Sequence, residues 1–566
     1  MRFRHLWDYA RVGFAAIVVL ALIAASGQPT EALTNSSADT SNVANDAVVS
    51  LSASGDGPSC TGVLVAPTLV LTAGHCMSGA IIEGGSGEWN SQAPIWRAYN
   101  LPDPGAEFSR NNGWISGLRG STRMYVNRII APFNYDNRVV ANVAACQSTC
   151  AGEGRCQGWT YQNSTRMCFL KDTPRFQVNF GNTHGSSTLT IASSQYSVPG
   201  FADIVMMRLD SPVPASTATP ATLLTHLPNT PEGIAAYLRR QTFQAVGFTS
   251  AQANRRTAPM QFFQYPYVDG LDALNDLAMV AVNNTSNSAI EGGDSGSPLF
   301  VTRTVGGRTQ RFVVGINQGV SGSLNRYTLT GLNLRQRGQL LTLPYDRSAL
   351  DLRRSAPIGE WLQNIMYADF AASSARRPLY NWFGEGRADN FLTSDPRWAS
   401  DPRGVQMDGS GDYVDPRRYQ DGYEMYRLEG YVFDPHRPQP AGTVALWSWF
   451  SSERGDNFST SDSRWASNPA SVRWAGESIA TQRTQDGYTQ YRLEGYIYDP
   501  RRPQPPNTRP LWSWFHPGRG DNFHTTDPRW GIPLATVRWV GENIEGVDRD
   551  GYRLYRLEGY VPINPG

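Results

Sequence analysis

Three short segments, far apart in the chain, carry a histidine, an aspartate and a serine in settings that suit nucleophilic catalysis. His75 lies in TAGHC, Asp203 precedes the apolar run IVMMRL, and Ser295 lies in the glycine-rich segment EGGDSGSP. A serine hydroxyl is a weak nucleophile until a base takes its proton, and histidine suits that role near neutral pH. A buried carboxylate fixes the imidazole tautomer and stabilises the imidazolium. We therefore expect His75 to be the base, Asp203 its orienting partner and Ser295 the nucleophile.

Strands must hold these three residues in place. Apolar residues alternate or cluster through 60–72, with a turn at 66–68, and this pattern predicts two strands that end just before the histidine. Apolar runs follow the aspartate and the serine, so each of these residues is expected where a loop meets a strand. The glycines before the serine let main-chain N–H groups turn toward a developing oxyanion. The N–H groups of Gly293 and Ser295 are therefore the predicted oxyanion hole.

The three segments, in this order, resemble the chymotrypsin-like (trypsin-fold) serine proteases. The spacing between the aspartate and the serine is typical of that family, and APIGEWLQNIM at 356–366 resembles its closing helix. The resemblance covers about 43–130 and 191–370. It implies a mostly β protein with two six-stranded β-barrels, a triad between them and a disulfide Cys60–Cys76 beside the histidine. No cofactor is implied.

The specificity pocket departs from the trypsin pattern. In trypsin-like members an aspartate six residues before the nucleophile selects Arg or Lys, and an alanine stands there in this chain. Without a buried negative charge, burying an unpaired arginine would be costly. GDSGSP also resembles the corresponding motif of glutamyl endopeptidases. Their pocket histidine would align near Ile316, which is not a histidine, so a preference for glutamate is not supported. We expect a small or apolar residue before the cut. The predicted pocket residues are Ala289, Ile290, Asn317, Gln318 and Gly319.

An insertion of unusual length separates the histidine from the aspartate. Between about 131 and 190 it holds four of the six cysteines. Apolar residues and cysteines recur at helical spacing over 139–150, and two β-like runs follow around a polar turn at 163–165, so a helix and then a hairpin are expected. These features resemble the PAN/Apple module.

Four cysteines allow three pairings, and the sequence alone does not choose between them. The module's pattern implies Cys146–Cys168 and Cys150–Cys156. The insert is interpreted as a module that binds protein or carbohydrate near the cleft; a disulfide-stapled surface loop without a ligand is the alternative. A zinc site is not expected, because His184 is the one histidine nearby, and no other metal site is predicted.

Three copies of one unit, about 65 residues apart, follow a predicted linker at 371–378. Aromatic and polar residues alternate in each copy, which indicates β-hairpins that close into one pseudo-threefold domain. The repeats are similar to aromatic-rich tandem repeats appended to secreted bacterial hydrolases. Two copies contain Arg-Gly-Asp, but the first has Arg-Ala-Asp at the same place, so the tripeptide is interpreted as a repeat turn. Most aromatic residues are expected to fill the core, and carbohydrate or cell-surface attachment is an open alternative.

The chain's charge and N-terminus indicate an exported protein. A formal charge of +1 gives no global attraction to nucleic acid. A basic start, an apolar run of 14 residues and small residues after it predict a cleaved signal peptide. An uncleaved anchor is the alternative, but the run is short for a bilayer. An even number of cysteines fits disulfides in an oxidising compartment, so we expect a secreted, extracellular protein without a membrane segment after cleavage.

The leading hypothesis is a secreted serine endopeptidase that acts on protein or peptide substrates. The alternative is a catalytically silent adhesin on a protease scaffold. The predicted division is a signal peptide at 1–26, a propeptide or linker at 27–42, the first barrel at 43–130, the insert at 131–190, the rest of the first barrel, the second barrel and the closing helix at 191–370, the linker at 371–378 and the three-repeat β domain at 379–566.

Overall fold

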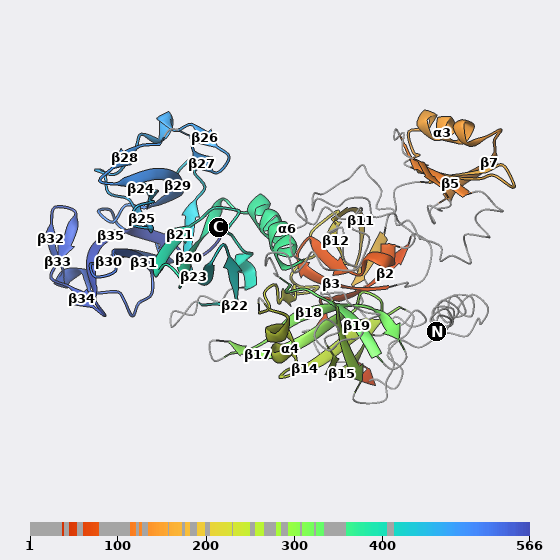
Figure 1. Cartoon of the computed structure of the whole chain (residues 1–566), viewed down its shortest axis with the longest axis horizontal. Coiled ribbons are helices and arrows are strands. Elements are labelled where there is room, and N and C mark those ends of the chain that lie inside the picture. Colours follow the sequence, from red (N-terminus) through yellow and green to blue (C-terminus); the bar gives the residue numbers. More distant parts are fainter. Residues whose placement is uncertain are drawn as a thin grey trace, which may run out of the picture.

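A computed structural model of the chain describes two β-barrels, a small disulfide-bonded unit and a C-terminal β domain joined to the barrels by a helix (Figure 1). The predicted signal peptide lies outside the described residues, and no helix within them is long and apolar enough to cross a membrane. The described residues are 37–38, 45–53, 60–77, 114–119, 124–126, 134–156, 158–171, 176–180, 189–197, 204–228, 230–248, 255–264, 279–284, 293–305, 308–321, 324–332, 358–404, 413–480 and 482–566.

The first barrel is a closed ring of six strands in the order β10-β11-β12-β4-β3-β2. β3 is buried at every position, and the turn at 67–68 returns the chain as β4, as the apolar run 60–72 predicts. The strands are β2 (Val48–Ala53), β3 (Cys60–Ala66), β4 (Leu69–Thr72), β10 (Phe176–Phe180), β11 (Leu189–Ser197) and β12 (Val205–Leu209).

The second barrel closes in the order β14-β17-β18-β19-β16-β15, with β15 pairing back to β14. Both barrels share one apolar core, so they form one body. The strands are β14 (Thr242–Phe248), β15 (Arg255–Gln264), β16 (Met279–Asn284), β17 (Pro298–Val305), β18 (Arg308–Ser321) and β19 (Leu324–Leu329); β1 (Ser37–Ala38) pairs with β15, β13 (Thr222–Leu223) pairs with β18, and α4 (Pro231–Leu238) begins after the cap Thr230. The mostly β fold with two six-stranded barrels is the one predicted.

The insert is a five-stranded sheet in the order β6-β5-β8-β9-β7 with one helix on it. A small core of cysteines and aromatic residues, including Trp159 and Tyr161, lies beneath the helix. The elements are β5 (Trp114–Leu118), β6 (Met124–Val126), β7 (Asn134–Val139), α3 (Val143–Gly152), β8 (Gly158–Gln162) and β9 (Met167–Lys171).

Strand pairing divides the chain differently from the predicted insert at 131–190. β5 and β6, placed by the sequence in the first barrel, pair within the insert sheet, and β10, placed in the insert, pairs with β2 and β11 of the barrel. The helix is also shorter than the spacing over 139–150 predicts. It starts at Val143, because the side chain of Asn142 caps it by accepting a hydrogen bond from the N–H of Ala145.

Helix α6 (Ile358–Ser373) joins the barrels to the C-terminal domain. It is the closing helix expected over 356–366, and its apolar residues Ile358, Trp361, Leu362 and Ile365 are buried in the barrel core. The helix continues into the predicted linker at 371–378, where β20 begins at Arg376. Asp369 explains the extension: it accepts from Thr68 and pairs with Arg208 of the first barrel at 3.7 Å and with Arg403 of the first repeat at 3.0 Å. The junction is therefore packed rather than a free linker.

The C-terminal domain consists of three equivalent units, each with a strand, a short strand and a long returning strand. The units are β20 (Arg376–Gly384), β21 (Asp389–Thr393) and β23 (Tyr423–Phe433); β24 (Thr443–Ser451), β25 (Asp456–Thr460) and β29 (Tyr488–Tyr498); and β30 (Thr508–His516), β31 (Asp521–Thr525) and β35 (Tyr552–Pro562). Shorter elements are η4 (Pro402–Gly404), β22 (Tyr413–Gln420), η5 (Pro469–Ser471), β26 (Trp474–Ala475), β27 (Ser478–Ile479), β28 (Thr484–Gln485), η6 (Leu534–Thr536), β32 (Arg538–Val540), β33 (Asn543–Glu545) and β34 (Asp548–Arg549).

Each unit fills its own core with aromatic side chains, as predicted for most of them. Trp382, Trp449 and Trp514 occupy equivalent positions and are fully buried. Each meets a second tryptophan edge-on at 4.9–5.2 Å between ring centroids, a favourable aromatic geometry. The aromatic-rich pattern of the sequence is thus mainly a packing pattern.

Candidate active site and the axis of the repeat domain

The loop that carries Ser295 is bonded to the first barrel through one residue, Thr61 of β3. The N–H of Thr61 donates to the carbonyl of Ser295 at 2.8 Å, and its hydroxyl donates to the carbonyl of Gly293 at 2.9 Å. The same hydroxyl accepts from the N–H of Phe248 at 3.1 Å. Ser295 itself is half-buried, so the loop is fixed while its nucleophile candidate keeps access to solvent.

The second barrel holds the same loop from the other side. The N–H of Gly296 donates to the carbonyl of Asn317 at 2.8 Å, and the side-chain amide of Asn317 donates to the carbonyl of Asp294 at 3.1 Å. Gly293 and Gly296 have φ angles of 102° and 84°, which favour glycine. A Cβ on Gly296 would lie 2.1 Å from the carbonyl oxygen of Thr61. The glycines flanking the serine are therefore required by the turn and by the close approach of β3.

The predicted base lies on the short helix η2 (Gly74–Met77), which follows β4. The disulfide Cys60–Cys76 fastens η2 to β3. Sγ of Cys76, the residue after His75, lies 3.4 Å from the carbonyl oxygen of Ser295. The structure therefore brings η2, the element that carries His75, against the loop of the predicted nucleophile through the side chain of Cys76.

The predicted orienting residue, Asp203, lies outside the described residues, as do the pocket residues Ala289 and Ile290. The strand that follows the aspartate is described: Val205 of β12 pairs with Thr72 of β4, shortly before η2. This pairing places the start of β12, two residues after Asp203 in the sequence, beside the end of β4, which leads into η2.

The remaining predicted pocket residues lie on β18. The side chain of Asn317 is buried and engaged: its amide group donates to the carbonyl of Asp294 at 3.1 Å, and its oxygen accepts from the N–H of Gly319 at 2.9 Å. The side chain of Asn317 therefore supports the Ser295 loop. Because that side chain is occupied, only the main chain of Asn317 could contribute to a substrate pocket. Gln318 is half-buried and donates to Thr328, and Gly319 has a φ of 144° with open space where a Cβ would stand.

Two residues support this site: Thr61, which carries no signal in the sequence, and Asp294, which belongs to the glycine-rich motif EGGDSGSP. Thr61 is one residue after a half-cystine, and its contacts with Gly293 and Phe248 join positions far apart in the chain. Asp294 is fully buried against Gly247, where a Cβ would come within 2.1 Å of its carboxylate. Burial and the nearby Asp294 carboxylate raise the pKa of Tyr327, which keeps this phenol neutral.

The insert contains the disulfides Cys146–Cys168 and Cys150–Cys156, the pairs that the PAN/Apple pattern implies. All four cysteines are buried around Trp159. A domain of this size has a small core, so the crosslinks supply much of its stability.

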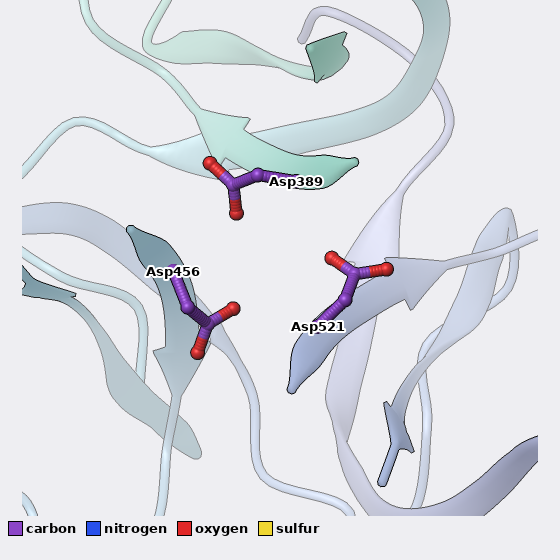
Figure 2. Close-up of side chains that lie close together, drawn as sticks. All are labelled: Asp389, Asp456 and Asp521. Carbon is purple, nitrogen blue, oxygen red and sulfur yellow. The ribbon is translucent and has the colours of Figure 1, made fainter. Parts of the chain in front are cut away.

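Three aspartates meet on the axis of the repeat domain. Asp389, Asp456 and Asp521 come from β21, β25 and β31 and converge on one centre (Figure 2), with ligand atoms within 4.8 Å of one another. The latter two are the aspartates of the Arg-Gly-Asp tripeptides, and both are about 3% exposed. Both tripeptides lie on turns and their carboxylates point into the domain rather than to its surface, which agrees with the interpretation of the tripeptide as a repeat turn.

These carboxylates are the group among the described residues that could hold a metal ion, yet each is already engaged. Asp456, for example, accepts from the hydroxyl of Tyr488 and from the main-chain and side-chain amides of Asn522. The other two repeat this pattern, each with an asparagine of the next unit around the ring. Burial raises the pKa of Asp456 to about 6, although these donors oppose the shift. The cluster therefore serves as a lock between repeats.

Comparison with protein-family models finds two domains. The model "Trypsin" matches residues 36–95, and the model "PAN domain" matches 123–195. The trypsin match contains His75 and ends before Asp203 and Ser295, and the PAN match extends past the insert sheet into β10 and β11. No curated protein matches the chain. The chain thus contains a trypsin domain and, between strands of its first barrel, a PAN domain, followed by three aromatic-rich β repeats.

Proposed function

We propose that the protein is a secreted serine endopeptidase with His75, Asp203 and Ser295 as its triad. The observation that carries this proposal is the docking of the Ser295 loop on β3 beside η2, through Thr61 and Cys76. The match to the trypsin model at 36–95 independently supports the enzyme class. Three buried disulfides fit an extracellular location.

The proposed reaction is acyl transfer to the serine and then to water. His75 takes the proton of the Ser295 hydroxyl as the oxygen attacks the peptide carbonyl, and Asp203 orients the imidazole. The N–H groups of Gly293 and Ser295 stabilise the oxyanion. His75 then gives the proton to the leaving amine, and water releases the acyl group by the same route. The fixed loop supports this role, because donors that need no rearrangement are the effective ones.

The PAN insert and the C-terminal repeat domain are proposed to bind ligands that hold the protease close to its substrate or to a surface. The PAN match supports protein or carbohydrate binding by the insert. For the repeat domain we propose attachment to carbohydrate or to a cell surface, supported by its polar and aromatic pockets between repeats.

A panel of fluorogenic peptides tests the proposed enzyme and its preference together. We expect cleavage after small or apolar residues such as alanine, valine and leucine, because the position that carries an aspartate in trypsin-like members is Ala289. Preference for arginine or glutamate would overturn the assigned preference. Failure to cleave any peptide or casein would support the silent-adhesin alternative.

Thr61→Val is expected to lower kcat by about tenfold to a hundredfold, with a much smaller change in KM. The substitution keeps the shape of the side chain but removes its hydrogen bonds to Gly293 and Phe248, each of which contributes about 1 kcal/mol or more when buried. Steady-state kinetics on the best peptide of the panel measure this effect. Thr61→Ser keeps the hydroxyl and should restore most of kcat. Equal kcat in the wild type, Thr61→Val and Thr61→Ser would show that the hydrogen bonds of the Thr61 hydroxyl do not position the nucleophile.

A further inference from the structure

A pocket of about 380 Å³ opens between the second and third repeats, around Trp539. Trp539 is 45% exposed and belongs to the hairpin β32–β33, at the outer end of the C-terminal domain (Figure 1). Exposed aromatic surface beside a concave site that also holds polar groups is typical of ligand-binding sites. The lining residues used below are Val444, Asp499, Arg501, Trp539, Glu542 and Arg556.

The equivalent space between the first and second repeats is filled by an arginine. Arg377 of β20 donates to Glu477 at 2.7 Å and pairs with Asp434 at 3.2 Å. The strand register places Val444 of β24 at the position of Arg377. Valine is too short to reach either carboxylate, so the same space stays open one repeat later.

The aromatic face is also covered in one repeat and uncovered in the next. His436 lies against Trp474, with 4.4 Å between ring centroids. The residue at the position of His436 in the following repeat is Arg501, whose side chain is 68% exposed and pairs with Asp499 at 2.9 Å. Trp539, the counterpart of Trp474, therefore keeps its exposed surface.

The polar groups around Trp539 balance one another in charge. Asp499 pairs with Arg501 at 2.9 Å, Glu542 pairs with Arg556 at 3.1 Å, and Arg501 also lies 3.4 Å from Glu542. An ionic ligand would have to displace one of these partners, at the cost of leaving another charge unpaired. Carboxylates and guanidiniums that are already paired still offer planar arrays of acceptors and donors to neutral hydroxyl groups.

We infer that this pocket binds a neutral sugar ring of a polysaccharide. One apolar face of the ring lies on the indole of Trp539, and hydroxyls at its edge bond to Asp499, Arg501 and Glu542. The volume is near the lower end of the ~300–1,000 Å³ usual for small-ligand sites, which suits about one or two rings. The inference rests on the proposed attachment role of the repeat domain and places that role in one of its grooves.

Pull-down of the full-length protein on insoluble cellulose, chitin and starch, with heparin-agarose as the anionic comparison, tests the pocket. Trp539→Ala is expected to weaken retention on the neutral matrix that binds best by about tenfold or more, because the stacking surface is lost. Val444→Arg copies Arg377 and should abolish retention by filling the pocket, with a melting temperature equal to or above that of the wild type. Trp474→Ala is the matched control and should be retained like the wild type.

The outcomes separate the pocket from the broader role. Retention of the wild type that neither Trp539→Ala nor Val444→Arg reduces would overturn the pocket and leave the attachment role standing. Retention on heparin alone would contradict a neutral ligand. Absence of wild-type retention on every matrix would overturn the attachment of the repeat domain to glycans and the pocket with it.

Discussion

Replacing Ser295 by alanine is expected to lower turnover by about 10⁶-fold, because a triad acts as a unit and loses nearly all of its effect when its nucleophile is removed. The fold should not change. The contacts that hold the loop, from Thr61 and from Asn317, involve main-chain atoms of residues 293–296 rather than the serine hydroxyl. The loss should therefore appear in kcat on casein or a cleavable peptide, at an unchanged melting temperature.

His75→Ala and the double variant sharpen this test. If the two residues act together, each single variant and the double variant should retain about the same residual rate, since their effects are not additive. Hydrolysis of casein by Ser295→Ala at the wild-type rate would refute the assignment of the nucleophile. A double variant that is much slower than either single variant would show that the two residues act independently.

The parts of the fold that could be predicted are those encoded in local patterns. The strands at 60–72 and the helix that starts at Ile358 follow from apolar periodicity, and the glycines around Ser295 follow from the turn that they permit. The three disulfide pairs needed the family patterns, because spacing alone left the pairing of the insert open.

Features that depend on the choice of a distant partner could not be predicted. β5 and β10 are both plausible strands in the sequence, yet β5 pairs inside the insert and β10 closes the barrel. The length of α6 depends on Asp369, whose partners lie in a barrel turn, in β12 and in the first repeat. Thr61 is likewise recognisable only after β3 is seen against the Ser295 loop.

The way the three repeats close into a ring could be predicted only in part. The sequence shows that three glycines follow Glu429, Glu494 and Glu558, but not why. Each glycine has a φ between 143° and 159°, and a Cβ on it would lie 2.5–2.8 Å from a carbonyl oxygen of a neighbouring repeat. The returning strands can therefore meet at the axis only where side chains are absent.

Glu494→Ala is expected to destabilise the repeat domain by about 3–5 kcal/mol, the usual cost of removing one member of a buried, hydrogen-bonded charge pair. Glu494 is fully buried and pairs with Arg492 at 3.0 Å. It accepts from the main-chain N–H of Ser394 at 2.6 Å and from the hydroxyl of Thr393 at 3.1 Å, both in the first repeat. It also accepts from Ser448 within its own repeat, so alanine would leave several buried donors without an acceptor.

The contacts of this glutamate run in one direction around the ring. Glu494 of the second repeat bonds to the first, Glu558 of the third bonds to the second, and Glu429 of the first bonds to the third. Because every repeat is held by both of the others, weakening one junction should lower the stability of all three together. The domain should therefore unfold in a single transition at a lower denaturant concentration, rather than losing one repeat first.

Guanidinium unfolding of the full chain, followed by tryptophan fluorescence, measures this effect, since ten of its 16 tryptophans lie between 376 and 566. Glu453→Ala, on an exposed turn of the same repeat, is the matched control and should change the free energy of unfolding by about 0.5 kcal/mol or less. A new early transition in Glu494→Ala would show that the repeats unfold independently. If Glu494→Ala changes the free energy of unfolding no more than the control does, the contacts of Glu494 contribute little. Packing of the apolar strands at the axis would then have to hold the three repeats together.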